Sequence, residues 1–389
     1  MNVCRFFLFV FVLLVQACTH VPEQREQAEI IPATKYLPKG GKIMVLAGQS
    51  VRATLDYYGS DTIPRPAGFT DYISYDKGSP YRDFAPDAPR HYQGNDALLE
   101  PTNWGAGVQC VDCNLSRPEF ARAVVAIGMY MAGPRYEDGS MCRGTEDCNT
   151  HKIAVGEYDE QLAVLAKWMN GLKGRPVLLR IGYEFDGSWN NYDPTQFKQA
   201  YKYIVRYLEQ AGVNNVAYIW QSFGYASRET LEAYFPEPDK FRASYVDWVG
   251  YTHFNLNPDI PGVNENQFAR DRGLKSFMSE LTPHTGDCTR QIDLKTHTEL
   301  GRQWLENLFT HIEENKDVLR GISYINENWS DKVYAPQWED QQDHNCGGYF
   351  SKSNARLQDN PELEKLWAEK ISAPLFLNAQ DNLYQQLEQ

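Results

Sequence analysis

Eight short apolar segments recur along the chain, and long amphipathic stretches separate several of them. The apolar segments span residues 42–49, 66–75, 123–131, 176–184, 215–221, 245–253, 275–280 and 321–327. In the stretches 158–172, 194–211 and 299–318, apolar residues are spaced three and four apart, which predicts helices. Strands that alternate with helices pair in parallel, so eight of them predict an α/β fold, a (β/α)8 TIM barrel.

The folded part of the chain shows no internal boundary. Between residues 41 and 389 there is no Pro/Gly/Ser-rich linker, charge block or short repeat. We therefore expect one barrel over 41–389, with long loops at 76–122, 281–296 and 328–357. Loops that follow the strands of such a barrel lie at its catalytic face.

The first 17 residues have the layout of a secretory signal peptide. Arg5 precedes the apolar run 6–15, which is too short for a permanent membrane-spanning helix. Val15-Gln-Ala-Cys18 resembles the lipobox of bacterial lipoproteins, which implies cleavage before Cys18 and acylation of its thiol. An ordinary signal peptide is the alternative. Because Thr19 rather than Asp follows the cysteine, we expect a cell-envelope lipoprotein of the outer membrane, tethered by residues 18–40. Partitioning of the intact protein into detergent tests this expectation.

The net charge restricts the partners of the protein. It is −13, and it becomes −14 without residues 1–17, which carry only the positive charge of Arg5. An acidic surface repels polyanions, so we expect no nucleic-acid partner. The expected contacts are a polysaccharide or oligosaccharide substrate and the membrane through the N-terminal lipid, with the protein itself a monomer.

Six cysteines follow Cys18, an even number in a chain that we expect to be exported. Such a set favours disulfides over metal binding. Closeness in sequence pairs Cys110 with Cys113 and Cys142 with Cys148, which leaves Cys288 for Cys346. The alternative is a zinc site formed by the first four of these thiolates. The oxidising compartment argues against it, as do the five residues that separate the members of the second pair.

The fourth apolar segment ends in Arg180-Ile-Gly-Tyr-Glu184, and Trp189 follows five residues later. Alternation along a strand would place Arg180, Gly182 and Glu184 on one face. A carboxyl group at a strand end, with a guanidinium beside it and an aromatic ring nearby, is typical of a sugar-cleaving acid. A structural ion pair between Arg180 and Glu184 is the alternative.

A second glutamate, Glu280, ends the seventh apolar segment. Glycoside hydrolysis needs two carboxyl groups. Glutamates at the ends of strands four and seven resemble the arrangement in clan A glycoside hydrolases. Arg-x-x-x-Glu followed by Gly and Trp resembles family 26, which includes β-mannanases and β-1,3-xylanases. Over about residues 41–329, this resemblance implies a retaining, endo-acting hydrolase that cleaves a β-mannan, β-xylan or related β-glycan by double displacement, without a cofactor.

The resemblance also implies roles for single residues. Glu184 matches the general acid/base, Glu280 the nucleophile, Arg180 the arginine of strand four and Trp189 an aromatic platform for sugars. Because a general acid must be protonated when it meets its substrate, we expect Arg180 to lie nearer to Glu280, or to a sugar hydroxyl, than to the proton of the acid.

Further substrate contacts are expected on strands six and eight. Tyr251 and His253 share one face of strand six, and one of them, preferably Tyr251, would be the family's tyrosine beside the nucleophile. Trp329 after strand eight matches the sugar-stacking tryptophan. The chain departs from the family where Tyr183, another expected contact, replaces the usual His, and where Phe185-Asp186-Gly187 replaces Met-Asn-Gly.

Some residues allow more than one interpretation. Glu327 could contact substrate or be a structural acid, and Asp186 could bind sugar hydroxyls or form a turn. His253 and His284 could bind metal with the cysteines, but no metal-ligand spacing supports this, so we expect no metal.

For the whole chain, the alternative is a surface lipoprotein that binds glycan without cleaving it. The presence of both glutamates favours the enzyme, because binding needs neither an acid nor a nucleophile.

Overall fold

The computed structural model describes residues 34–77, 94–103, 107–136, 140–254, 261–283, 292–330 and 353–388. These residues belong to one compact unit, Ile31–Gln389. The predicted signal peptide and Cys18 lie outside the described residues, so export and acylation stay predictions. Within the described ranges, none of the helices is long and apolar enough to cross a membrane.

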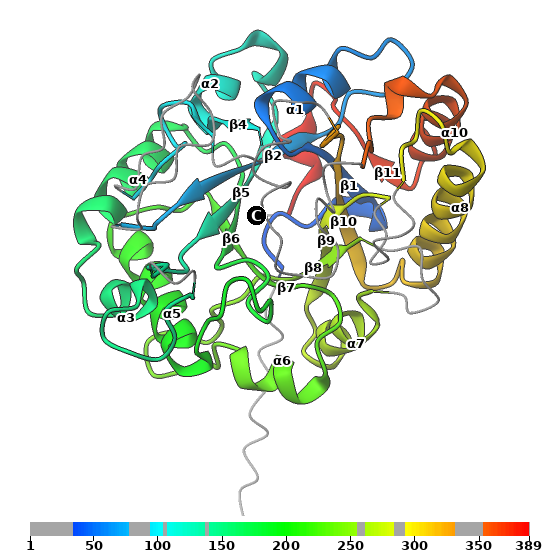
Figure 1. Cartoon of the computed structure of the whole chain (residues 1–389). Helices are drawn as coiled ribbons and strands as arrows, with labels where there is room; N and C mark the ends of the chain where they lie inside the picture. Colours follow the sequence, from blue (N-terminus) through cyan, green and yellow to red (C-terminus); the bar gives the residue numbers. More distant parts are fainter. Residues whose placement is uncertain are drawn as a thin grey trace, which may run out of the picture. The chain divides into compact units, whose positions relative to one another are not determined.

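Eight parallel strands close into a barrel (Figure 1). They are β1 (Ile43–Gly48), β2 (Gly68–Ser74), β5 (Val124–Tyr130), β6 (Val177–Ile181), β7 (Val216–Ser222), β8 (Trp248–His253), β9 (Lys275–Leu281) and β10 (Leu319–Ile325). Each strand pairs with the next, and β10 pairs with β1 to close the sheet. The short β11 (Phe376–Leu377) adds to β1. All eight predicted segments form strands, and the predicted TIM barrel is confirmed.

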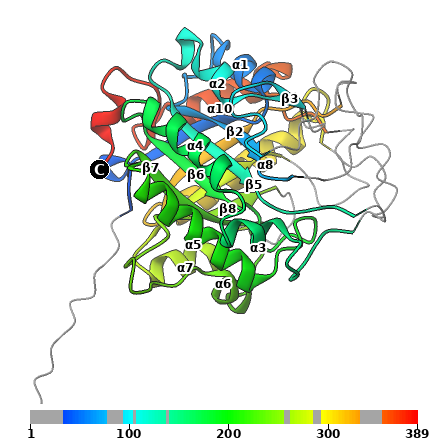
Figure 2. The ribbon, with the colours of Figure 1, turned by 90° about the vertical axis from the view of Figure 1, so that its left-hand side faces the viewer.

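Helices surround the sheet, and Figure 2 shows α3, α4 and α5 along one side of it. The α-helices are α1 (Val51–Tyr58), α2 (Val111–Leu115), α3 (Asn149–Ala154), α4 (Asp159–Gly171), α5 (Pro194–Gln210), α6 (Arg228–Tyr234), α7 (Val263–Asp271), α8 (Thr298–Glu314) and α10 (Pro361–Ile371). The strands β3 (Thr102–Asn103) and β4 (Val108–Gln109) pair with each other as a two-stranded antiparallel ribbon. Single 3-10 turns occupy Lys39–Gly41, Pro118–Phe120, Leu357–Asp359 and Leu383–Gln386.

The helix α5 shows how the sequence determines these elements. Pro194 occupies its first turn, and the side chain of Asp193 accepts hydrogen bonds from the backbone N–H groups of Thr195 and Gln196. This capping satisfies donors that have no partner within the helix. The buried side chains recur at helical spacing and form one apolar stripe: Phe197, Ala200, Tyr201, Ile204, Val205 and Leu208.

The interior of the barrel is apolar at one end and polar at the other. The apolar end is filled by side chains such as Met44, Leu46, Val124, Ala126, Leu178, Ala217, Ile219, Trp248 and Phe277. Toward the carboxyl ends of the strands, the inward side chains include Arg180, Gln221 and Thr252, all fully buried. The active site of a TIM barrel lies at the carboxyl ends of the strands, which is the polar end here.

A bulge in β9 turns Glu280 into the barrel. Met278 lies opposite Tyr251 on β8, but the next pair is Glu280 with Thr252, so β9 contains one additional residue there. Met278 and Leu281 both pack in the layer between sheet and helices. In a regular strand, Glu280 would share the side of Met278 and face the helices. The extra residue reverses its direction, as bulges near active sites commonly do.

Two of the three predicted disulfides lie within the described residues, and both form. The Cα atoms are 5.3 Å apart in Cys110–Cys113 and 5.4 Å apart in Cys142–Cys148. These four cysteines are therefore paired with each other, and the alternative of a zinc site is wrong. Cys288, Cys346 and His284 lie outside the described residues. Within the described part of the chain, no group of three His, Cys, Asp or Glu residues could hold a metal ion.

Candidate active site

Arg180 on β6 lies at the centre of a buried polar network. Its Nη1 donates to Glu280 Oε1 at 2.5 Å and to Gln221 Oε1 at 3.0 Å, and its Nη2 donates to Thr70 Oγ1 at 3.1 Å. The guanidinium carbon lies 4.7 Å from the ring centre of Tyr72. Arg180 thus forms its ion pair with Glu280, as predicted, and the alternative of a pair with Glu184 is wrong.

Glu184 lies beyond the end of β6, on a turn. The strand ends at Ile181, and both Gly182 (φ 57°) and Glu184 (φ 51°) have left-handed backbone conformations. The prediction that strand alternation aligns Arg180, Gly182 and Glu184 is therefore wrong. Asn190 stabilises the turn, because its Nδ2 donates to the carbonyl oxygens of Tyr183 (2.9 Å) and Glu184 (3.0 Å). A left-handed non-glycine residue costs about 1–2 kcal/mol, which such bonds offset.

Gly182 is required by this turn for two reasons. Its positive φ suits glycine, and a Cβ atom there would lie 2.5 Å from Met131 Cε and 2.7 Å from Phe197 Cε2. A side chain at this position would therefore collide with the layer that packs β6 against α5. Gly182, two residues before Glu184, is therefore a sequence signal for the turn.

Glu184 is 7% exposed, and its carboxyl group accepts two hydrogen bonds. Thr252 Oγ1 donates to Oε1 at 2.7 Å, and Trp189 Nε1 donates to Oε2 at 2.9 Å. Burial and then the nearby charge of Glu280 raise the pKa of Glu184 to about 8, although the two hydrogen bonds act in the opposite direction. The upward shift in pKa favours the protonated form of Glu184, which is the form that a general acid needs.

Glu280 has the environment of a charged carboxylate. It is 5% exposed, and Oε1 accepts from Arg180 and, at 3.3 Å, from Gln221 Nε2. The same nitrogen of Gln221 donates to Thr252 Oγ1 at 3.1 Å. A continuous chain of hydrogen bonds, Glu280 to Gln221 to Thr252 to Glu184, therefore joins the two carboxyl groups. One protonated and one charged carboxyl group in a single site can perform acid and nucleophilic chemistry.

Two predicted aromatic contacts lie beside Glu184. Trp189 is 43% exposed and stands edge-on to Phe223, with ring centres 4.6 Å apart. An exposed indole bonded to the acid fits the predicted sugar platform. The Tyr183 ring is half-buried and stands edge-on to Tyr72, with ring centres 5.3 Å apart. Burial raises the pKa values of Tyr72 and Tyr183 well above the usual range, so both phenols stay neutral.

Tyr251 and His253 do share one face of β8, but it is the outer face. The Tyr251 hydroxyl lies 3.2 Å from Nε2 of His311 on α8, and the rings of His253 and His311 have centres 5.4 Å apart. The expectation that Tyr251 or His253 lies beside Glu280 is therefore wrong. Trp248 packs inside the barrel, so alternation turns Thr252 inward and its two neighbours outward.

Sequence reasoning missed four inward residues of the network: Thr70, Tyr72, Gln221 and Thr252. Each is a side chain with a hydrogen-bonding group within a buried strand, and that was the available signal. An isolated threonine or glutamine in a strand predicts no particular chemistry. Their importance becomes visible only when the barrel brings β2, β6, β7, β8 and β9 around one point.

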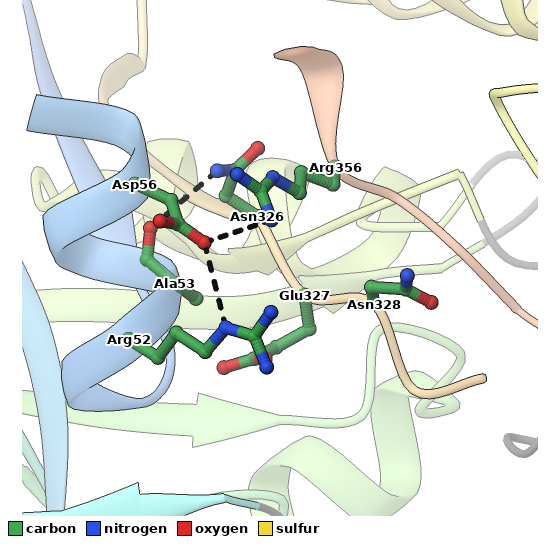
Figure 3. A pocket seen from close by; sticks show the side chains of 7 residues that line it. All are labelled: Arg52, Ala53, Asp56, Asn326, Glu327, Asn328 and Arg356. Carbon is green, nitrogen blue, oxygen red and sulfur yellow. Dashed lines mark hydrogen bonds and ion pairs between the residues drawn. The ribbon is translucent and has the colours of Figure 1, made fainter. Parts of the chain in front are cut away.

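The end of β10 forms a small charged hollow beside α1 (Figure 3). Glu327 Oε1 accepts from the backbone N–H of Ser50 at 2.7 Å, which fits a structural acid. Asp56 pairs with Arg356 at 3.1 Å and with Arg52 at 3.8 Å, so opposite charges compensate each other there. Ala53, Asn326 and Asn328 complete the lining.

Two further candidates take part in packing or loop structure. Trp329 is 2% exposed and packs with Ile325 and Ala355. These contacts do not test its role in sugar stacking, which stays a prediction. Asp186 Oδ1 accepts from the backbone N–H of Phe223 at 2.6 Å. This bond joins the loops after β6 and β7 and supports a structural role for Asp186.

Comparison with known proteins finds a family and relatives that match most of this chain. The family model of glycosyl hydrolase family 26 matches residues 102–318. The β-1,3-xylanase TXYA of Vibrio sp. is 28% identical over 371 residues, which cover 91% of this chain and 69% of the relative. A β-1,3-xylanase of Alcaligenes sp. is 27% identical over 373 residues, which cover 91% and 68%.

Solved structures are similar in fold. GH26C from Muricauda sp. superposes with a TM-score of 0.54 at 15% identity, over 88% of this chain and 90% of the other. A GH26 β-mannanase from Bacteroides ovatus superposes with a TM-score of 0.52 at 14% identity, over 89% and 93%. At such identities the likeness shows the barrel fold alone.

Proposed function

The chain belongs to glycosyl hydrolase family 26, and on that premise we propose that it is a retaining, endo-acting hydrolase of a β-1,3-xylan. The observation that carries the proposal is the pair of carboxyl groups joined through Gln221 and Thr252. Arg180 holds Glu280, and the pKa of Glu184 is raised to about 8. Membership of the family makes the chain a glycoside hydrolase. The stereochemistry and the polymer are the proposal.

The two carboxyl groups divide a double displacement between them. In the first step, Glu280 attacks the anomeric carbon and forms a glycosyl ester, while the bond to the leaving sugar breaks and Glu184 protonates the leaving oxygen. In the second step, Glu184 takes a proton from water, which attacks the anomeric carbon and releases Glu280. Once esterified, Glu280 has no charge, so the pKa of Glu184 falls and the former acid becomes a base.

An aromatic ridge, formed by Trp189, Phe223 and Tyr225, supports endo action. Ring centres are 4.6 Å apart from Trp189 to Phe223 and 5.8 Å apart from Phe223 to Tyr225, and Trp189 and Tyr225 are each 43% exposed. The ridge begins at the acid, which protonates the leaving sugar. Aromatic faces bind the apolar faces of sugar rings. A ridge on this side would hold more than one sugar unit of the leaving chain.

The choice of polymer rests on the two relatives, both named β-1,3-xylanases and both aligned over 91% of this chain. The β-mannanase structures share the fold at 14–17% identity and carry no argument for mannan. Tyr183, which replaces the usual histidine before the acid, agrees with a central sugar site that differs from that of the mannanases.

We expect β-1,3-xylan to be cleaved faster than β-mannan or β-1,4-xylan, with short oligosaccharides as early products. A reducing-sugar assay on this panel, with chromatography of the products, measures both the rate and the endo pattern. If reducing sugar is released fastest from mannan, the proposed polymer is wrong, but the proposed type of reaction stands. Calorimetric binding of a β-glycan without release of reducing ends would favour the alternative, a non-catalytic glycan-binding lipoprotein.

A further inference from the structure

We propose that Thr252 is a positioning residue for the reaction, whose hydroxyl orients the carboxyl group of Glu184 and favours its ionised form. The proposal deepens the function proposed above and rests on it. Thr252 is fully buried on β8, and its Oγ1 lies 2.7 Å from Glu184 Oε1. It lies where the family resemblance led us to expect a tyrosine, on the sixth strand of the barrel.

The direction of this hydrogen bond is fixed by a residue that can only donate. Arg180 Nη1 donates to the amide oxygen of Gln221 at 3.0 Å, which fixes which end of the amide is oxygen and which is nitrogen. That nitrogen donates to Thr252 Oγ1 at 3.1 Å. Since Thr252 accepts there, its own hydrogen is available for Glu184 Oε1. The hydroxyl therefore donates to the ionised carboxylate.

The charges around Glu184 explain why such a donor is needed. Burial disfavours a negative charge on Glu184. So do the charges of Glu280 on β9 and of Asp186, which lies on the same loop as Glu184. Arg180 on β6 is already paired with Glu280. The phenols of Tyr72 and Tyr183 interact with Glu184 but stay neutral. Thr252 and Trp189 are the donors that oppose these effects, and the second step requires the ionised form.

The test is a carboxyl titration of the full chain without substrate. In protein labelled with ¹³C at the glutamate carboxyl carbons, the Glu184 resonance is assigned by its loss in Glu184→Gln. Thr252→Val should raise the pKa of Glu184 by about one unit, because one hydrogen bond to a charged group is removed. Thr252→Ser, which retains the hydroxyl, should titrate as the wild type does.

Thr282→Val is the matched control. Thr282 is also a fully buried threonine at the carboxyl end of the barrel, but its hydroxyl donates to the carbonyl oxygen of Ile325 at 3.3 Å. Its replacement should leave the titration of Glu184 unchanged. An unchanged pKa in Thr252→Val, an equal rise in Thr282→Val, or a failure of Thr252→Ser to restore the wild-type value would each overturn the proposal.

A kinetic readout links the proposal to the reaction. With an aryl β-glycoside whose departure still needs the acid, the alkaline limb of kcat/KM should move upward by about one unit in Thr252→Val and return in Thr252→Ser. Because the titration needs no substrate, it decides the contact even if the wild type cleaves no β-glycan. Inactivity of the wild type would therefore contradict the proposed function and leave the role of Thr252 to be judged by its own measurement.

Discussion

Replacement of Glu280 with glutamine is expected to lower kcat by about 10⁴-fold or more and to abolish the covalent glycosyl-enzyme. An amide cannot attack the anomeric carbon, whereas the carboxylate held by Arg180 and Gln221 can. Glutamine and alanine both remove the charge that pairs with Arg180, which is fully buried, but glutamine keeps an amide oxygen that can accept from the guanidinium. Alanine would leave Arg180 with neither the charge nor the acceptor. Such a change typically destabilises a protein by about 3–5 kcal/mol.

The intermediate is measured by mass spectrometry of enzyme quenched after reaction with a fluorinated activated glycoside. Wild type should gain the mass of one glycosyl group, and Glu280→Gln should not. Glu327→Gln is the matched control, because Glu327 is also a buried carboxyl group at this end of the barrel, where it accepts from Ser50. Loss of the intermediate in the Glu327 variant alone would assign the nucleophile to β10 and contradict the account.

Replacement of Glu184 with alanine is expected to lower turnover of the polymer by about 10²–10⁴-fold while sparing aryl glycosides with good leaving groups. Such groups depart without protonation, so the glycosyl-enzyme still forms. Without the base, its hydrolysis becomes slow and the intermediate accumulates. Added azide should restore turnover on the aryl substrate, because it attacks the intermediate without needing a base.

The pH profile distinguishes the acid from a residue that only binds substrate. Because Glu184 must be protonated in the first step, wild-type kcat/KM should fall as the pH rises through about 8. This alkaline limb should disappear in Glu184→Ala with an activated substrate. A fully active Glu184→Ala enzyme on polysaccharide would remove the residue from the mechanism. Two results together would exchange the roles of acid and nucleophile. Azide would rescue only the alanine variant of Glu280, and Glu184→Ala would fail to form the intermediate.

The barrel and both carboxylates could be predicted from the sequence because the strands lie in apolar segments and the glutamates follow at their ends. Every predicted strand overlaps an observed one. The ion pair between Arg180 and Glu280 could also be predicted, because a general acid and a guanidinium in contact would conflict chemically.

The directions of side chains could not be predicted in the same way. Glu280 faces inward because of a bulge in β9, and Glu184 does so because of a left-handed turn after β6. Both depart from simple alternation, and no residue pattern marks the bulge. On β8 the alternation itself is regular, but only the packing of Trp248 inside the barrel decides that Thr252, and not Tyr251, faces Glu184.

Double displacement through Glu280 can be read from the anomeric configuration of the first product. Proton NMR of the reaction on a β-linked oligosaccharide, recorded before mutarotation, resolves the two anomers of the new reducing end. Because two displacements retain the configuration, we expect the β-anomer to appear first and the α-anomer to grow only later. Initial formation of the α-anomer would mean a single displacement by water and would contradict the role of Glu280 as nucleophile.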